Sequence, residues 1–336
     1  MKINQIDIDQ QVFIVAEIGN NHEGNFDVAQ ELIRQAAKAG ADAVKFQTFL
    51  PEYLAGGDKV RFERLKDFQF SYEQFSKLAL VAQSEGIIFF STPFDPKSAD
   101  FLNEIQPVFK IASSDNTHWP FLRQIAHLGK PVILSTGMTT LSEISEMEKV
   151  IQIVWKEQNY DPGLALLHCV SSYPAPADQA NLKAIKTLAK NFQNCVPGYS
   201  DHTLGITAAL SAVAMGSRVI EKHFTLDKNY SDFRDHQLSA DPTDMKELVT
   251  HIRELESMLG SGQKAPQPNE LVMQEALRRS AAAAKDLKKG TVVSESDLIW
   301  VRPGSGVTWE HRDNLLGKKL NRDCKYADLI TIEDLA

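Results

Sequence analysis

The sequence predicts an α/β protein: a (β/α)8 barrel followed by a small, mostly β domain. Eight short apolar segments with strand character alternate with amphipathic helical segments over residues 12–259. The strand segments are apolar almost throughout, which is typical of parallel strands that are buried on both faces. After Gly260 the alternation stops, and short segments separated by turns follow.

Each strand segment is followed by a helical segment, and eight such units are the number that closes a barrel. The alternative is an open, doubly wound sheet. That sheet would want a glycine-rich phosphate turn after the first strand, and residues 19–24 (GNNHEG) do not match GxGxxG. The expected strands are residues 12–19, 43–48, 87–94, 108–113, 131–137, 164–171, 195–200 and 218–224. The expected helices are residues 27–40, 72–86, 97–105, 120–129, 141–158, 182–192, 206–216 and 245–259.

Three domains or segments follow from this pattern. Residues 1–260 form the barrel, residues 261–278 a linker that begins SGQKAPQPN, and residues 279–336 the small domain. The small domain has fewer than seventy residues and too few apolar side chains for a large core of its own. We therefore expect it to lean on the barrel or on a second subunit.

Composition excludes several classes of function. The formal net charge of −8 leaves no basic stripe for the phosphates of a nucleic acid. No apolar run approaches the roughly 20 residues that a membrane helix needs, and the first residues do not read as a signal peptide. The three cysteines show no CxxC spacing. We therefore expect a cytoplasmic protein that binds neither nucleic acid nor membrane.

The stretch from Gly198 to Phe224 contains a candidate metal site. His202 follows the seventh expected strand, and His223 lies at the end of the eighth. Glu221 and His223 are two residues apart, so they face the same way on a strand. Two imidazoles and a carboxylate at one barrel rim suit a divalent metal with open coordination positions.

Two lysines in apolar strands indicate an anionic substrate. Lys45 and Lys110 lie in the second and fourth expected strands, and a buried ammonium is costly without a charged partner. They read as ligands of a phosphate or carboxylate, although pairing with a buried carboxylate such as Glu17 is the structural alternative. Together with the strand-end hydroxyls, they suggest a doubly anionic substrate beside a metal.

Eight motifs in order resemble the sialic acid synthase family. They are AEIGNNHEGN, VKFQT, FSTPFD, FKIASSD, PVILSTGM, LHCVSSYPAP, GYSDHTLG and IEKHFT. Near the C-terminus, KDLKKGTVVSESDLIWVRPGSG resembles the antifreeze-like (SAF) module that follows the barrel in that family. Family members condense phosphoenolpyruvate with an N-acetylated amino sugar, and the resemblance covers essentially the whole chain.

The resemblance implies a role for each matching residue. His202 and His223 would bind the divalent metal, Mn²⁺ or Mg²⁺, and Glu221 would act as a catalytic base beside its water. Glu17 would be a second catalytic residue in contact with the sugar. The residues implied for phosphoenolpyruvate are Lys45, Thr92, Lys110, Ser113, Ser171, Tyr173 and Ser200. The residues implied for the sugar are Gln47, Asp115, Asp235 and Arg302, the last from the SAF module of a partner subunit in a domain-swapped homodimer.

Three departures from the family pattern concern the sugar rather than the reaction. Ser171 stands where bacterial sialic acid synthases have Asn, and Asp115 stands where they have Glu. The segment before Asp235 also differs from their glycine-proline-aspartate run. The acceptor is therefore open among N-acetylmannosamine and 2,4-diacetamido-trideoxyhexoses of the legionaminic or pseudaminic type.

Three other functions are the alternatives. A Schiff-base aldolase could use Lys45 or Lys110, but it would leave the histidine pair unexplained. A saccharide-binding or ice-binding protein could act through the SAF module, but it would leave the barrel rim without a purpose. A related phosphoenolpyruvate-condensing synthase for a sugar phosphate would lack the SAF module, and the sequence shows no separate basic cluster for a second phosphate.

Overall fold

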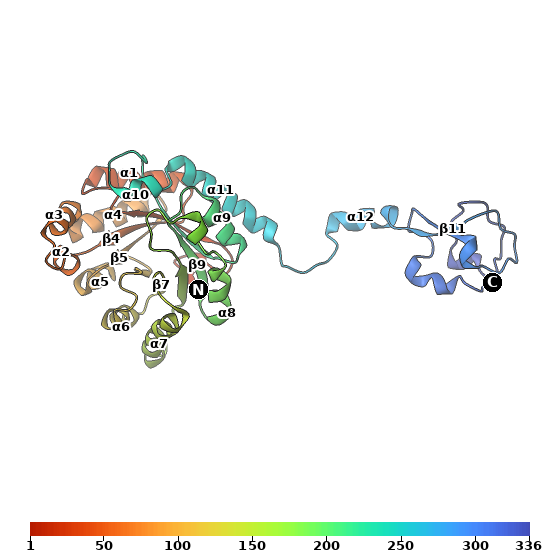
Figure 1. The fold of residues 1–336 in the computed structure, drawn as a ribbon, viewed down its shortest axis with the longest axis horizontal. Coiled ribbons are helices and arrows are strands. Elements are labelled where there is room, and N and C mark those ends of the chain that lie inside the picture. The colour runs from red at the N-terminus through yellow and green to blue at the C-terminus, as the bar shows by residue number, and fades with distance from the viewer. The chain divides into compact units, whose positions relative to one another are not determined.

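The computed structural model describes residues 1–336 except for the side chain of Arg234. The chain divides into two compact units, Met1–Gly260 and Ser261–Ala336, and each is described by itself (Figure 1). None of the helices among the described residues is long and apolar enough to cross a membrane.

The first unit contains a parallel eight-stranded sheet in the order β5-β4-β3-β10-β9-β8-β7-β6. The two end strands, β5 and β6, lie against each other, which closes the (β/α)8 barrel that the sequence predicts. The strands are β3 (Phe13–Gly19), β4 (Ala43–Thr48), β5 (Ile88–Pro93), β6 (Phe109–Ile111), β7 (Val132–Ser135), β8 (Leu164–His168), β9 (Val196–Asp201) and β10 (Val219–His223).

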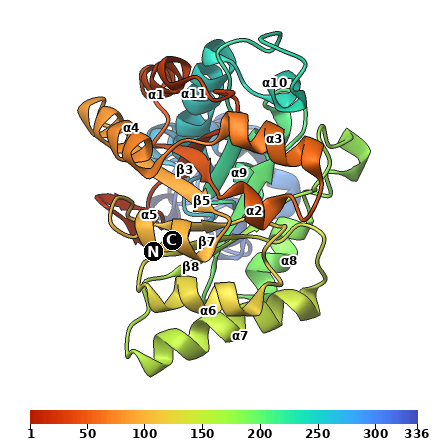
Figure 2. The ribbon, with the colours of Figure 1, turned by 90° about the vertical axis from the view of Figure 1, so that its left-hand side faces the viewer.

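Helices follow the strands and surround the barrel, as Figure 2 shows. They are α1 (Phe26–Ala39), α4 (Tyr72–Ser84), α5 (Pro96–Leu102), α6 (Trp119–His127), α7 (Leu141–Glu157), α8 (Ala184–Asn191), α9 (Thr207–Ala214) and α11 (Pro242–Leu259). Their starts follow local chemistry: Ser71 with Gln74 and Thr140 with Glu143 form capping boxes for α4 and α7.

Three further helices of this unit lie outside the segments that the sequence predicts to be helical. They are α2 (Pro51–Leu54), α3 (Lys59–Phe68) and α10 (Arg234–Leu238). The N-terminus also forms a small hairpin of β1 (Lys2–Ile3) and β2 (Ile6–Asp7). Helix α3 buries none of its side chains, so its sequence has no apolar periodicity from which the helix could be predicted.

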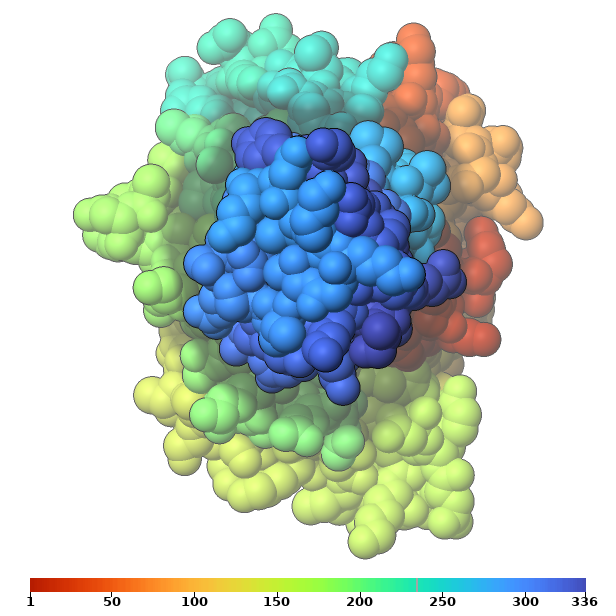
Figure 3. Space-filling model, turned by 90° about the vertical axis from the view of Figure 1, so that its right-hand side faces the viewer, coloured from red at the N-terminus to blue at the C-terminus, as the bar shows by residue number. Residues whose placement is uncertain are grey.

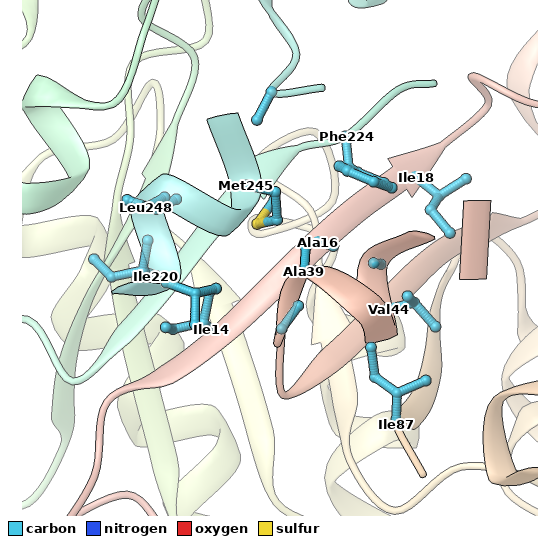
Figure 4. Close-up of a cluster of buried hydrophobic side chains, with 14 of the residues drawn as sticks. Ile14, Ala16, Ile18, Ala39, Val44, Ile87, Ile220, Phe224, Met245 and Leu248 are labelled. Carbon is cyan, nitrogen blue, oxygen red and sulfur yellow. The ribbon is translucent and has the colours of Figure 1, made fainter. Parts of the chain in front are cut away.

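Strand residues alternate between an outer and an inner core. Ile14, Ala16 and Ile18 of β3 belong to the outer core, which packs against α1 and α11 (Figure 4). Phe13 and Val15 of the same strand belong to the inner core. The inner core also contains Ile3, Ile8, Ala43, Ile88, Phe90, Val108, Ile133, Ala165, Leu167 and Val219. Apolar side chains therefore fill the amino-terminal part of the barrel interior.

The second unit contains α12 (Pro268–Leu277), within the segment expected as a linker, and the antiparallel pair β11 (Ser280–Ala283) and β12 (Leu298–Val301). Isolated bridges such as Leu287–Cys324 join its other segments. Its core is small and includes Ala281, Val293, Val307, Leu315 and Ile330. Figure 3 shows the surface of the second unit, in blue, as one body.

Candidate active site

A cavity of about 530 Å³ lies at the carboxyl ends of the barrel strands, and we call it the strand-end cavity. Every one of the eight strands, or the segment directly after it, contributes to its lining. The contributors are Glu17, Lys45, Gln47, Thr92, Lys110, Ala112, Ser113, Ser135, Cys169, Ser171, Ser200, His202, Glu221 and His223. The inner core changes from apolar to ionic here because each of Glu17 and Glu221 stands two residues after an apolar inward residue.

Two buried lysines and two buried glutamates form a network in which positive and negative side chains alternate. Lys45 Nζ is 2.7 Å from Glu17 Oε2 and 3.7 Å from Glu221 Oε2. Lys110 Nζ lies 4.0 Å from the same oxygen of Glu221. Hydroxyls complete the network: Thr92 accepts from Lys45 at 3.0 Å, Ser135 accepts from Lys110 at 2.7 Å, and Ser200 donates to Glu221 Oε1 at 2.8 Å.

Burial and neighbouring charges determine the pKa values of the four side chains in this network. Burial alone would raise the pKa of Glu221, but Lys110 and Lys45 outweigh it and lower that pKa. Burial raises the pKa of Glu17, although Lys45 opposes the shift. Burial disfavours the charge on Lys45, but Glu17 and Glu221 reverse this effect and raise its pKa. Burial lowers the pKa of Lys110. Glu221 is thus the carboxylate held most firmly in its ionised form.

His202 and His223 lie beside the network of lysines and glutamates. Their ring centroids are 5.4 Å apart, and the ring of Tyr173 lies 4.2 Å from that of His202. His202 Nδ1 is 2.7 Å from the carbonyl oxygen of Val170. Because a carbonyl only accepts, Nδ1 carries the proton and Nε2 keeps its lone pair in the neutral ring.

These residues fit a divalent metal. Burial lowers the pKa of both His202 and His223, and a neutral imidazole is the form that binds metals. His223 Nδ1 is buried without a hydrogen-bond partner among the described residues. The described part of the chain contains no group of three His, Cys, Asp or Glu side chains arranged as a metal site. The fit therefore depends on the histidine pair, with further coordination positions left for substrate and water.

The residues that precede the two histidines in the sequence form a buried ion pair. Asp201 and Lys222 precede His202 and His223 in the chain, and their side-chain atoms Oδ2 and Nζ are 3.1 Å apart. Both are almost completely buried. Asp201 Oδ1 also accepts from the backbone and the hydroxyl of Thr203, each at 2.8 Å. This network joins the ends of β9 and β10, and the sequence analysis gave it no role.

Gly137, which follows β7, allows Ser113 after β6 to approach Cys169 and Ser171 after β8. Its backbone N–H donates to Ser113 Oγ at 3.0 Å, and Ser113 Oγ is 3.1 Å from Cys169 Sγ. A Cβ on Gly137 would lie 2.5 Å from Ser171 Oγ and 2.7 Å from Ser113 Oγ. The site therefore has no room for a side chain at this position.

Most of the residues expected to bind the sugar also line the cavity. Gln47 Nε2 donates to Glu17 Oε1 at 3.2 Å, and Asn20 Nδ2 donates to Gln47 Oε1 at 2.9 Å. Asp115 follows β6, and Asp235 comes from α10. The remaining expected residue, Arg302, follows β12 in the second unit and is exposed there.

Several lining residues had no role in the sequence analysis: Asn20, Arg61, Arg64, Ser135 and Cys169. Ser135 and Cys169 could have been found from the strand period, since they stand two residues after Ile133 and Leu167 of the inner core. The two arginines could not, because they belong to α3.

A parallel barrel with a polar cavity at its carboxyl strand ends is the arrangement of barrel enzymes. Comparison with known proteins identifies the family: residues 32–264 match the NeuB family, and residues 278–336 match the SAF domain. The chain belongs to the NeuB family, with a C-terminal SAF domain, as the sequence motifs predict.

Named relatives and a solved structure support the same family assignment. The chain is 43% identical to N,N'-diacetyllegionaminic acid synthase of Legionella pneumophila, covering 92% of this chain and 90% of that protein. It is 39% identical to pseudaminic acid synthase of Campylobacter jejuni (98% and 98%) and 34% identical to human N-acetylneuraminate-9-phosphate synthase (96% and 90%). The structure of N-acetylneuraminic acid synthetase from Leptospira borgpetersenii, in complex with citrate, matches with a TM-score of 0.76 and 37% identity over 82% of this chain and 96% of that one.

Proposed function

We propose that this protein condenses phosphoenolpyruvate with an N-acetylated amino sugar and water to give a nonulosonic acid and phosphate. It is an enzyme of the transferase class, like its named relatives, which are nonulosonic acid synthases. The observation that carries the proposal is the strand-end cavity, in which two buried lysines stand beside a neutral histidine pair.

The lysine side of the cavity suits phosphoenolpyruvate. Lys45 and Lys110 would bind its phosphate and carboxylate, since ammonium groups in a site shielded from water stabilise anions strongly. Ser113 and Ser171 would add hydrogen bonds through the space that Gly137 leaves. The other proposed contacts are Thr92, Tyr173 and Ser200.

A second group of lining residues suits the open-chain amino sugar. Gln47 and Asp115 present an amide and a carboxyl, groups that bind hydroxyls and acetamido N–H groups. Glu17 would also contact the sugar near the reacting aldehyde. Asp235 would bind from α10, and Arg302 would reach the sugar from a partner subunit in a domain-swapped homodimer.

His202 and His223 would hold a divalent metal, Mn²⁺ or Mg²⁺. When bound there, the ion would supply Lewis-acid polarisation of the aldehyde oxygen. The carbonyl of Val170 fixes the ring of His202, so that Nε2 is the nitrogen available for the metal.

The chain's own residues would guide the bond changes. C3 of phosphoenolpyruvate attacks the aldehyde carbon and forms the new C–C bond, while cationic character develops at C2. Glu221, held ionised by the lysines and by Ser200, takes a proton from the water that adds to C2. The aldehyde oxygen takes up a proton and becomes a hydroxyl. The tetrahedral intermediate then collapses: the C2 hydroxyl loses its proton and becomes the keto group, the bond between C2 and the bridging oxygen breaks, and phosphate leaves with that oxygen. Lys45 and Lys110 offset the charge on phosphate throughout.

The geometry disfavours the Schiff-base alternative. A Schiff-base lysine attacks as a neutral amine, whereas Glu17 and Glu221 raise the pKa of Lys45. Lys110 has a lowered pKa, yet it donates to Ser135 Oγ and to the carbonyl of Ile111. Borohydride trapping of a lysine adduct would be needed to support this alternative.

Phosphate release from phosphoenolpyruvate tests the proposal. The assay compares N-acetylmannosamine with 2,4-diacetamido-trideoxyhexoses of the legionaminic and pseudaminic types, with and without Mn²⁺. In H₂¹⁸O, C–O cleavage predicts that the released phosphate contains no ¹⁸O. His223→Ala is expected to abolish Mn²⁺ binding in calorimetry together with phosphate release. Incorporation of ¹⁸O into phosphate, or full activity of His223→Ala in the presence of a chelator, would overturn the mechanism.

A further inference from the structure

The connection between β10 and α11 supplies part of the wall of the strand-end cavity. Phe233 and Asp235 of this connection both line the cavity, and Asp235 lies in α10. Helix α10 has only five residues. So short a helix is not stable through its own hydrogen bonds. The contacts around α10 therefore determine where the side chain of Asp235 lies.

Glu23, from the connection between β3 and α1, holds this segment at two points. Its Oε1 accepts a hydrogen bond from the hydroxyl of Ser231, just before α10, and lies 2.9 Å from Nε2 of His236, within α10. Ser231 Oγ in turn accepts from the backbone N–H of Phe233 at 3.0 Å. One carboxylate therefore contacts the chain on both sides of Asp235.

His236, which directly follows Asp235, is completely buried and is held at both ring nitrogens. Its Nδ1 is 2.7 Å from Thr225 Oγ1. The hydroxyl of Thr225 donates its proton to the carbonyl oxygen of Asp227 at 3.1 Å, so Thr225 Oγ1 accepts from Nδ1, which carries the proton. The ring therefore joins α10 to Glu23 on one side and to the end of β10 on the other.

The connection that contains Glu23 has a defined conformation of its own. Glu23 has a φ of +45°, in the left-handed region that few residues other than glycine adopt. A Cβ on the next residue, Gly24, would lie 2.1 Å from a backbone oxygen of α3, so only glycine allows this approach. Asn21 Nδ2 donates to the carbonyl oxygen of Phe224 at 2.8 Å and to Ser239 Oγ at 3.0 Å. The same connection therefore also holds the chain before and after α10.

The pair of Glu23 and His236 has no direct part in the proposed chemistry. Among the described residues that line the cavity, neither of the two is found. A pair outside the cavity affects a reaction through the lining residues that it places. The nearest of these in the chain is Asp235, a proposed contact of the sugar, which directly precedes His236.

We propose that Glu23 and His236 are positioning residues: they hold α10 so that Asp235 is placed to bind the amino sugar. The inference rests on the proposed function, because it takes Asp235 as a contact of the sugar. It separates the two substrates. Loss of the pair should weaken binding of the sugar, whereas the proposed contacts of phosphoenolpyruvate come from other connections and strands and should be unaffected.

Hydrogen exchange tests the placement of α10 without reference to activity. In Glu23→Ala, the peptide that spans residues 231–240 should exchange about tenfold faster than in wild type, because local opening of α10 no longer breaks the bonds to the carboxylate. Its reporters include the N–H groups of His236 and Ser239, which are hydrogen-bonded within the segment. Glu23→Gln keeps an acceptor oxygen and should stay within about threefold of wild type. Glu31→Ala is the matched control, since Glu31 is bonded to residues of its own helix, α1.

Steady-state kinetics test the consequence for the sugar. The acceptor is whichever of N-acetylmannosamine and the two 2,4-diacetamido-trideoxyhexoses supports phosphate release in wild type. Glu23→Ala should raise KM for this sugar about tenfold and leave KM for phosphoenolpyruvate within about threefold, because a displaced contact weakens only the ligand that it binds. Glu23→Gln should restore most of the loss. The double variant Glu23→Ala/Asp235→Asn should be no more than about threefold worse than Asp235→Asn, since the first residue acts through the second.

Two kinds of failure are distinguishable. Unchanged exchange in Glu23→Ala, equal rises of both KM values, or a double variant with multiplied losses would overturn the inference and leave the proposed function intact. A merely structural role would lower the unfolding midpoint without separating the two KM values. If wild type releases no phosphate with any of the three sugars, the proposed function itself fails, and the exchange experiment still shows whether Glu23 holds α10. The Glu23 side chain is 24% exposed, so its removal leaves no large buried cavity.

Discussion

The two ends of the barrel interior use the same eight strands for opposite purposes. At the amino-terminal end, Phe13 and Val15 of β3 point into an apolar core that Ile3 and Ile8 of the N-terminal segment complete. At the carboxyl end, the next inward residue of β3 is Glu17, which pairs with Lys45. One step of two residues along a strand therefore changes the interior from core to site.

The charged side chains at the two ends of the barrel differ in how far they are exposed to solvent. At the amino-terminal end, Asp42 accepts from the backbone N–H of Ile14 at 2.8 Å and pairs with Arg253, whose side chain is 31% exposed. At the carboxyl end, Lys45, Lys110 and Glu221 are all buried, and Lys110 Nζ lies 4.0 Å from Glu221 Oε2. We therefore expect the first pair to stabilise the fold, whereas the second set is the one proposed to bind an anionic substrate.

Lys45→Met is expected to have the largest effect. It leaves Glu17 and Glu221 facing each other and removes a cation from the proposed phosphoenolpyruvate site. We expect kcat/KM for phosphoenolpyruvate to fall about 10³-fold, the scale of losing one preorganised electrostatic contact. Steady-state phosphate release measures it. Arg253→Met, at the other end, should lower the unfolding midpoint and leave kcat/KM within about threefold. Equal losses of kcat/KM in Lys45→Met and Arg253→Met would contradict the division between a site at the carboxyl end and a stabilising ion pair at the amino-terminal end.

The buried pair Asp201–Lys222 is expected to matter for stability more than Asp42–Arg253. Lys222→Met leaves a buried carboxylate unpaired, which costs about 3–5 kcal/mol of unfolding free energy. The double variant Asp201→Asn/Lys222→Met should recover most of the loss, because no buried charge remains. Arg253→Met should cost about 1 kcal/mol, since its pair is partly solvated. Urea unfolding of the four proteins checks the order, and a double variant no better than Lys222→Met would contradict it.

Gly137→Ala tests how tightly the carboxyl end is packed. The new methyl group must displace Ser113 or Ser171, so we expect KM for phosphoenolpyruvate to rise about tenfold with a smaller change in stability. Gly129→Ala is the contrast: its φ of +68° is strained for alanine, but no atom lies within 4 Å of its Cβ position. It should cost about 1 kcal/mol of stability and leave KM unchanged. A KM for Gly137→Ala that matches wild type would show that the serines are not needed there.

The smallest expected effect concerns His22, a titratable group near the site that belongs to the core. Its ring stacks on Phe70 at 4.2 Å, its Nδ1 accepts from Gly24 N–H, and burial lowers its pKa to about 3. Only the unfolded chain binds its proton between pH 6.5 and 3, so His22 lowers stability as pH falls through this window.

Relative to His22→Gln, which keeps an acceptor for Gly24, wild type should lose about 1.4 kcal/mol between pH 7.5 and 5.5. Chemical denaturation at both pH values measures this difference. An identical pH dependence in the two proteins would mean that His22 takes up its proton in the folded state.

The sequence predicted the eight strands to within about two residues at most ends because strands buried on both faces are apolar and short. It also predicted that His202, Glu221, His223 and the two lysines meet, since parallel strands end at one rim. The roles of the site residues stay predictions, as do the linker at residues 261–278 and the contact of Arg302 with a partner.

What the sequence did not reveal depends on tertiary position. Helix α3 buries no side chain, so it has no apolar stripe, and Arg61 and Arg64 resembled surface residues. Asp201 and Lys222 resembled parts of the metal motif, yet they face the outer side of the strands and pair with each other. Partners that lie 21 residues apart on neighbouring strands cannot be matched without the strand register.

The strand-end cavity has two sources of side chains, and this division has a consequence for evolution and engineering. The part proposed for phosphoenolpyruvate is built from the strands, whose register the whole barrel fixes. Arg61, Arg64 and Phe233 come from the connections after β4 and β10. Such connections can be exchanged without disturbing the strands. Transplanting residues 49–70 from a relative should therefore change which sugar is accepted while leaving the chemistry of the shared donor in place.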